Sequence, residues 1–153
     1  MNLLYALSFI FWSFFGVLNY TDELKTFYRK QIEELLKKYD ADRLLGTKTF
    51  TLELNNNGFL RYKRILASNK TEYYSVRIEK VQKLNYYGNE KSGWLSVVCE
   101  PSSVIFQSYK DPAGDVDSMA NEINFPLKGI SEEELNSLNK SFDFLRENSK
   151  YIP

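Results

Sequence analysis

The chain has 153 residues, of which 43% are hydrophobic and 16% aromatic, so it can bury a core and is neither disordered nor of low complexity. Twenty basic residues balance twenty acidic ones, which argues against a nucleic-acid partner. Histidine is absent and Cys99 is the single cysteine. These facts exclude a histidine-activated nucleophile, an internal disulfide and the usual zinc sites.

The chain opens with an uncharged apolar segment, Leu3 to Leu18. A helix of this length would span about 24 Å, less than a hydrocarbon core of about 30 Å, which favours a signal peptide. No basic residue precedes the segment and no small-residue cleavage site follows it, which favours retention. We expect residues 1–20 to be a signal peptide or membrane anchor, and a buried core helix is the third alternative. Cleavage predicts export to the periplasm or extracellular space, whereas retention with Lys25, Arg29 and Lys30 beyond the segment predicts an anchored, cytoplasmic body.

An amphipathic helix is predicted over 22–39, capped by Thr21 or Asp22. Its apolar stripe recurs every three or four residues and comprises Leu24, Phe27, Tyr28, Ile32, Leu35, Leu36 and Tyr39. Such a stripe typically packs on its own domain. A partner helix or a membrane surface is the alternative.

From Lys48 onward the apolar residues alternate, which predicts strands. Turn residues such as Asn55 to Gly58 separate them. The expected strands are 48–54, 59–66, 72–81, 94–100, 104–110 and an edge strand over 123–127, with loops over 87–93 and 111–122.

The last helix is predicted over 132–148. Ser131 and Glu134 form a capping box, and Ile130 and Leu135 occupy the positions of a hydrophobic staple. The predicted fold is therefore α+β, an antiparallel meander or partly open barrel of five to six strands with an N-terminal amphipathic helix and a capped C-terminal helix. Residues 21–153 form a single domain, with the sheet over 48–127.

This order of elements over 48–148 resembles a pleckstrin-homology-like barrel, in which a last helix closes one end. The N-terminal helix and the lack of a basic headgroup-binding loop depart from that pattern. The segments Gly93 to Cys99 and Phe125 to Leu127 also resemble small uncharacterised bacterial proteins that carry signal sequences. Neither resemblance implies an activity or a site.

A possible binding surface is predicted from exposed residue types near turns. Aromatic side chains there suit recognition of a peptide or sugar, and two basic residues on one strand face suit an acidic partner. Packing and a solvated sheet face are the alternatives. The residues are Trp94, Tyr86, Tyr87, Tyr109, Arg61 and Lys63.

The sequence predicts no catalytic, cofactor or metal site. The acidic loop Asp111 to Asp117, with Glu122 nearby, does not match an EF-hand, so calcium binding is only an alternative to a solvated loop. Cys99 alternates with Leu95 and Val97, which predicts a buried thiol.

The functional hypothesis is an envelope or membrane-associated, non-catalytic interaction module with a protein partner, attached to the membrane through its N-terminal segment. A different class is a small carboxylate-dependent hydrolase that uses residues such as Glu72, Asp115 and Asp117. A third alternative is an accessory subunit of a membrane complex.

Overall fold

The computed structural model describes the backbone of residues 3–149 and the side chains of residues 20–149. Within that part, two α-helices flank eight strands, which confirms the α+β class and the predicted order of elements. The elements are α1 (Leu3–Lys38), the 3₁₀ turn η1 (Asp42–Leu45), β1 (Thr47–Leu54), β2 (Phe59–Leu66), β3 (Thr71–Arg77), the 3₁₀ turn η2 (Ile78–Lys80), β4 (Val81–Gly88), β5 (Gly93–Cys99), β6 (Val104–Tyr109), β7 (Asp117–Ala120), β8 (Glu122–Leu127) and α2 (Glu132–Ser149).

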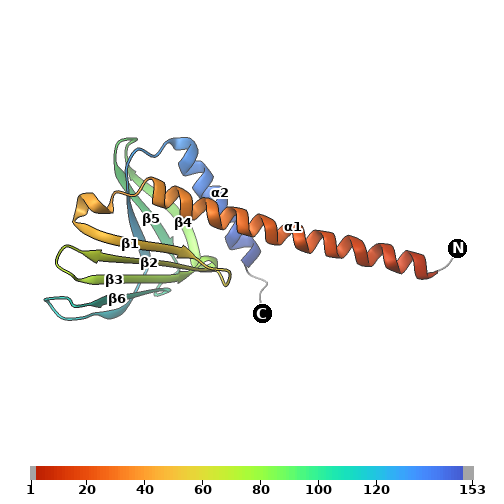
Figure 1. Cartoon of the computed structure of the whole chain (residues 1–153), viewed down its shortest axis with the longest axis horizontal. Coiled ribbons are helices and arrows are strands. Elements are labelled where there is room, and N and C mark those ends of the chain that lie inside the picture. The colour runs from red at the N-terminus through yellow and green to blue at the C-terminus, as the bar shows by residue number, and fades with distance from the viewer. Residues whose placement is uncertain (1–2, 150–153) are drawn as a thin grey trace.

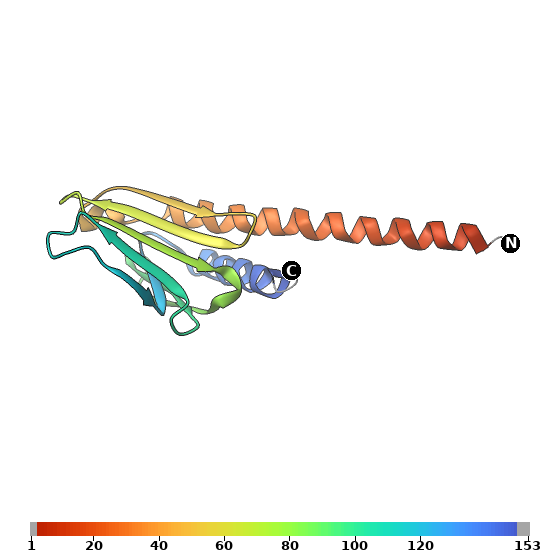
Figure 2. The same ribbon diagram turned by 90° about the horizontal axis from the view of Figure 1, so that it is seen from below.

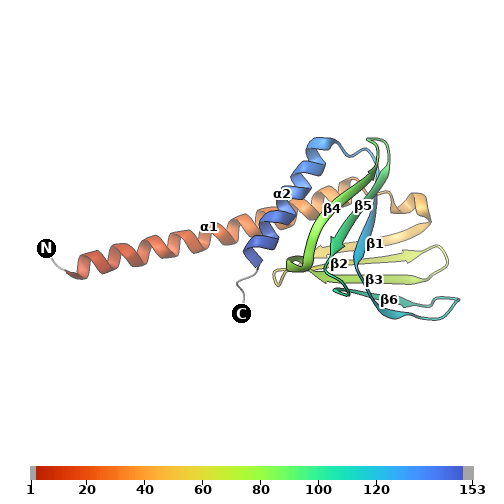
Figure 3. The same ribbon diagram turned by 180° about the vertical axis from the view of Figure 1, so that it is seen from behind.

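The strands form two antiparallel sheets, β1-β2-β3-β6-β7 and β4-β5-β8. After β3 the chain leaves the first sheet and forms the β4–β5 hairpin of the second. It then returns for β6 and β7, and crosses again at Asn121 into β8. Figures 1 and 3 show the strands of the two sheets crossing steeply. The sheets therefore pack face to face and do not close into a barrel.

Two of the eight strands were not expected from the sequence. The predicted strand 72–81 ends at Arg77, where η2 turns the chain into β4, and β4 continues to Gly88 in the expected loop. A Cβ on Gly88 would lie 2.4 Å from the Cα of Gly93, so this hairpin requires glycine. β7 lies in the other expected loop, with three exposed residues and one half-buried residue. It is defined by backbone pairing with β6, which apolar periodicity does not reveal.

The core lies between the sheets and beneath the helix pair. Tyr62 of β2 and Phe125 of β8 join the two sheets, with ring centroids 4.8 Å apart. Ile32 and Leu36 of α1, with Phe142 of α2, are buried in the same cluster. α1 contacts β1 and α2 contacts β4, so the helices cover the side on which these two strands are sheet edges.

α1 is one continuous helix from Leu3, so the predicted start and cap near Asp22 are wrong. Neither glycine nor proline lies between Leu18 and Asp22, and the helix continues through that segment. Five residues of the predicted apolar stripe pack on the body, whereas Leu24 is only half-buried and Phe27 is 56% exposed. The five are Tyr28, Ile32, Leu35, Leu36 and Tyr39. The first part of α1 extends beyond the body as a rod (Figures 1 and 2).

The predicted signal or anchor, residues 1–20, falls almost wholly on residues whose side chains lie outside the described part, and it stays a prediction. Over the residues that are described with their side chains, none of the helices combines the length and the apolarity needed to cross a membrane.

α2 begins as predicted. The Ser131 N–H donates to Glu134 Oε2 at 3.1 Å, and the Glu134 N–H donates to Ser131 Oγ at 3.3 Å, which confirms the capping box. Tyr39, just after α1, donates a hydrogen bond to the same Glu134 carboxylate. Glu134 of the capping box therefore also links the end of α1 to the start of α2.

Candidate functional site

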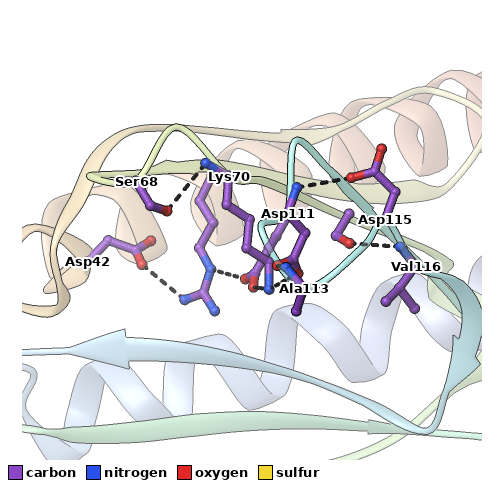
Figure 4. A network of polar contacts seen from close by, with 10 residues as sticks. Asp42, Ser68, Lys70, Asp111, Ala113, Asp115 and Val116 are labelled. Carbon is purple, nitrogen blue, oxygen red and sulfur yellow. Dashed lines mark hydrogen bonds and ion pairs between the residues drawn. The ribbon is translucent and has the colours of Figure 1, made fainter.

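Charged side chains form a network on the inner face of the five-stranded sheet (Figure 4). Arg64 and Glu72 are register partners on β2 and β3, and Arg64 Nε lies 2.7 Å from Glu72 Oε2. Arg64 Nη1 also lies 3.4 Å from Oδ1 of the buried Asp42. Lys70 bridges Glu72 at 3.2 Å and Asp111 at 2.7 Å. The network thereby connects η1, β2, β3 and the loop after β6.

At the buried end of this network, both carboxylate oxygens of Asp42 accept hydrogen bonds. Asp42 accepts hydrogen bonds from the Tyr62 hydroxyl and, at 3.2 Å, from Thr47 Oγ1. Burial and the Asp42 carboxylate raise the pKa of Tyr62 far above its ordinary value, so its hydroxyl stays a donor. Every buried side-chain nitrogen and oxygen in the described part has a partner. The network therefore has a structural role, and it carries no unpaired reactive group.

Beside the network, a pocket opens where the two sheets diverge. Its volume is about 370 Å³, within the range of small-molecule sites. One side is formed by β2, β3, β6 and β7 of the larger sheet, and the other side by β5 and β8 of the smaller sheet. We call it the edge pocket, and it is lined by Arg64, Tyr74, Trp94, Phe106, Ala120, Glu122 and Asn124.

Large apolar side chains gather at the surface next to η1. Four of them, which we call the apolar patch, line one hollow of about 360 Å³ together with Pro126. They come from η1 and from register partners on β4 and β5. Their exposed fractions are 70% for Leu44, 49% for Leu45, 62% for Tyr87 and 41% for Trp94.

The structure divides the six predicted surface residues between two faces. Tyr87 and Trp94 are adjacent on the apolar patch, and Trp94 also lines the edge pocket. Tyr86 is half-buried and its hydroxyl donates to the Asn89 carbonyl at 2.8 Å.

The other three predicted residues lie on the outer face of the five-stranded sheet. Lys63 and Tyr109 line a shallow hollow with Tyr73. Arg61 lies 4.0 Å from Glu53 on that face. Arg61 and Lys63 are both exposed, as predicted, whereas Arg64 between them turns inward.

The sequence reasoning missed the inward charges of Arg64 and Glu72. A signal was present, because Arg64 occurs in phase with the buried Leu60 and Tyr62, and Glu72 in phase with the buried Val76. A charge on the apolar phase of a strand indicates a buried ion pair. Leu44 and Leu45 were missed because η1 is too short to show a period.

The acidic loop after β6 is arranged by hydrogen bonds and one ion pair. Asp111 binds Lys70, and its N–H donates to Asp115 Oδ1 at 3.0 Å. Among residues with described side chains, no three cysteine, aspartate or glutamate residues are grouped as metal ligands. The two carboxylate oxygens of Glu72 bind Arg64 and Lys70.

Cys99 is buried, as its alternation with Leu95 and Val97 predicted. Burial, with a smaller contribution from the Glu122 carboxylate, raises the pKa of its thiol to about 12. The thiol therefore stays protonated near neutral pH, which is the unreactive form.

Comparison of the chain with protein-family models, curated proteins and solved structures gave no match. The two resemblances stated above therefore stay predictions.

Proposed function

We propose that the chain is a non-catalytic interaction module of the envelope or of a membrane surface, and that it binds a protein partner through the apolar patch. The exposure of Leu44, Leu45, Tyr87 and Trp94 around one hollow supports the proposal. Clustered apolar surface of this kind is typical of interaction sites, because leaving it in water costs free energy. Two of the four residues are the aromatic types that are enriched at interface hot spots.

The chemistry around the patch favours a partner with an apolar centre and an acidic rim. None of the described residues that line the hollow is charged. Its sequence neighbours Arg43, Lys91 and Lys128 are exposed cations, against one exposed acidic neighbour, Glu90. A complementary surface would place apolar side chains in the hollow and carboxylates around it.

The position of the patch favours a protein over the membrane that would hold the N-terminal segment. η1 and the β4–β5 hairpin lie at the end of the body away from the projecting start of α1 (Figure 1). A bilayer that contained residues 1–20 would leave the patch directed away from it.

The test compares variants of the full-length chain, cross-linked in native membranes and purified. Leu44→Ser with Tyr87→Ser removes two exposed apolar side chains from the patch. Tyr109→Ser is the matched control, since Tyr109 is 47% exposed on the opposite sheet face. We expect one stoichiometric partner with the wild type and the control, and its loss with the double variant. Equal recovery with the double variant, or no stoichiometric partner with the wild type, would contradict the proposal.

A further inference from the structure

The edge pocket is lined by three aromatic side chains from both sheets. Tyr74 and Phe106 pack with ring centroids 4.8 Å apart and ring planes inclined by 38°, and both remain half-exposed beside the pocket. Trp94, 41% exposed, lines it from the smaller sheet. The face of an aromatic ring carries negative potential, so a pocket with several rings attracts cations that are weakly hydrated.

The charged residues of the lining and of the network behind it carry more negative than positive charges. The cation in its lining, Arg64, already binds Glu72 and Asp42. Lys70, behind it, is shared between Glu72 and Asp111. The pocket wall and the network behind it therefore contain four carboxylates, including that of Glu122, and two cations. A bound cation would reduce this imbalance, whereas an anion would increase it.

Glu122 supplies the unneutralised charge in the lining. Its Oε2 accepts from Ser96 Oγ at 2.6 Å and its Oε1 accepts from Asn124 Nδ2 at 3.0 Å. Both donors are neutral, and among the described side chains no cation lies within ion-pair distance of Glu122. These two hydrogen bonds lower the pKa of Glu122, which therefore stays ionised and keeps lone pairs for a further donor.

The composition of the lining distinguishes between kinds of cation. A metal ion needs several oxygen ligands, but the lining has one carboxylate, one amide and one phenol among its side-chain oxygens. Apolar and aromatic walls instead favour an ion that carries its own hydrocarbon. A volume of about 370 Å³ fits such a small molecule or one long side chain.

We propose that the edge pocket binds an organic cation, an ammonium group carried on a short hydrocarbon chain, between the rings of Tyr74, Phe106 and Trp94 and beside the Glu122 carboxylate. The cation is either a free amine or a lysine side chain of a bound peptide. This site goes beyond the proposed function: it shares Trp94 with the apolar patch, but it does not require a partner bound there.

The test uses the full-length chain with Trp12→Phe, which leaves Trp94 as its single tryptophan. Choline and its neutral isostere 3,3-dimethylbutan-1-ol are titrated while Trp94 fluorescence is followed, with calorimetry on the wild type as a second readout. We expect saturable binding of choline that is about tenfold tighter than that of the alcohol. Hexanoate, an anion of similar size, should not bind.

Three variants distinguish a specific site from nonspecific electrostatic attraction. Glu122 is exposed, so Glu122→Gln should leave the fold intact and weaken choline binding about tenfold. Glu53→Gln, which removes an exposed carboxylate from the outer sheet face, should leave binding unchanged. Phe106→Leu should weaken binding of choline more than that of the alcohol, because only the cation interacts with the ring quadrupole.

Butylamine and the peptide acetyl-Gly-Lys-Gly-amide identify the source of the cation. Binding of butylamine supports a free amine, and binding of the peptide alone supports a lysine side chain. The proposal is overturned if no cation saturates, if choline and the alcohol bind equally, or if Glu122→Gln binds choline as the wild type does. Loss of the protein partner in the Leu44 and Tyr87 variant would not affect any of these measurements.

Discussion

The hydroxyl of Tyr62 donates a hydrogen bond to Oδ2 of Asp42, and both side chains are fully buried. The bond joins η1 to the middle of β2 in the five-stranded sheet. Because Asp42 also accepts from Thr47 and Arg64, its carboxylate lies in a polar shell within an apolar core. Removing one partner from such a shell leaves the buried charge uncompensated, which costs stability.

Removing the Tyr62 hydroxyl tests this relationship. Tyr62→Phe should lower the free energy of unfolding by about 2 kcal/mol, because a carboxylate loses one donor without access to water. Urea unfolding measures the change. Tyr73→Phe, on the outer face of the neighbouring strand, should change it by less than about 0.5 kcal/mol. If Tyr62→Phe changes the unfolding free energy no more than Tyr73→Phe does, the hydrogen bond of Tyr62 does not stabilise the fold.

Arg64 and Arg61 lie on the same strand, and their contributions to stability can be compared. Arg64→Met leaves Asp42 without its cation and Glu72 with Lys70 alone, so we expect a loss of about 3 kcal/mol in unfolding free energy. Arg61→Met removes a 43% exposed side chain that lies 4.0 Å from Glu53, and should cost less than about 0.5 kcal/mol. The same denaturant titration applies to both. A well-folded Arg64→Met of wild-type stability would disprove the structural role of the network.

The lowered pKa of Glu134 in the capping box predicts that the stability of the protein falls at acidic pH. A hydrogen bond from Tyr39, with further ones from Ser131 and Lys38, lowers the pKa of Glu134 to about 2, below its ordinary 4.5. A carboxyl whose pKa is lower in the folded state contributes stability above its unfolded pKa and loses that contribution as the pH falls. Glu134→Gln should therefore cost about 1 kcal/mol at pH 7, and the difference from wild type should shrink between pH 4.5 and pH 2.

Thermal unfolding of both proteins across that pH range would measure the effect. Glu133→Gln, an exposed neighbour on the same helical turn, is the control and should parallel the wild type. A constant difference between Glu134→Gln and wild type down to pH 2 would contradict the assignment.

The raised pKa of Asp40 predicts the opposite dependence of stability on pH. Burial, with the nearby Asp42 carboxylate, raises the pKa of Asp40 from 3.8 to about 6. An acid with a raised folded pKa opposes folding once it ionises, so stability is lost as the pH rises from about 4 through 6. Asp40→Asn keeps an oxygen for the Asp42 N–H, which donates to Asp40 Oδ1 at 3.1 Å.

We expect Asp40→Asn to raise the unfolding free energy by about 1 kcal/mol at pH 8, a modest value because solvent screens a partly exposed carboxyl. The gain should vanish below pH 4, where the wild-type carboxyl is protonated in both states. Chemical denaturation at the two pH values provides the measurement, and destabilisation at pH 8 would refute the prediction.

The thiol of Cys99 should be inert in the folded protein. Its burial and a pKa of about 12 predict that a thiol reagent labels it only after unfolding. Labelling at pH 8 with and without denaturant, followed by intact mass, tests this. Rapid labelling of the native protein would mean that β5 opens readily or that Cys99 is accessible.

Local chemistry explains why several elements were predicted well. The Asn55 side chain accepts from the N–H groups of Asn57 and Phe59, both at 3.0 Å, so the β1–β2 turn is encoded within five residues. Ser131 and Glu134 likewise define the start of α2 by themselves. Alternation placed Leu52, Leu60 and Val76 in the core because a strand has two faces and only one of them is buried.

The candidate sites were less predictable, because their residues come from distant segments. The sequence predicts Trp94 and Tyr87 among four aromatic residues near turns. Their neighbours Leu44 and Leu45 join them only because η1 packs beside the β4–β5 hairpin. The edge pocket combines residues of β2, β3, β5, β6, β7 and β8. No spacing in the sequence indicates that β4 and β5 form a second sheet.

The sequence by itself determined the α+β class, the turns, the cap of α2 and the buried phase of most strands, since each depends on neighbouring residues. Only the tertiary structure decided the division into two sheets and the partners of the charges. Arg64 shows the difference. Its place on the inward phase of β2 is a local property, whereas its neutralisation by Asp42 and Glu72 depends on the folding of η1 and β3 against β2, because ion pairing acts through space and not along the chain.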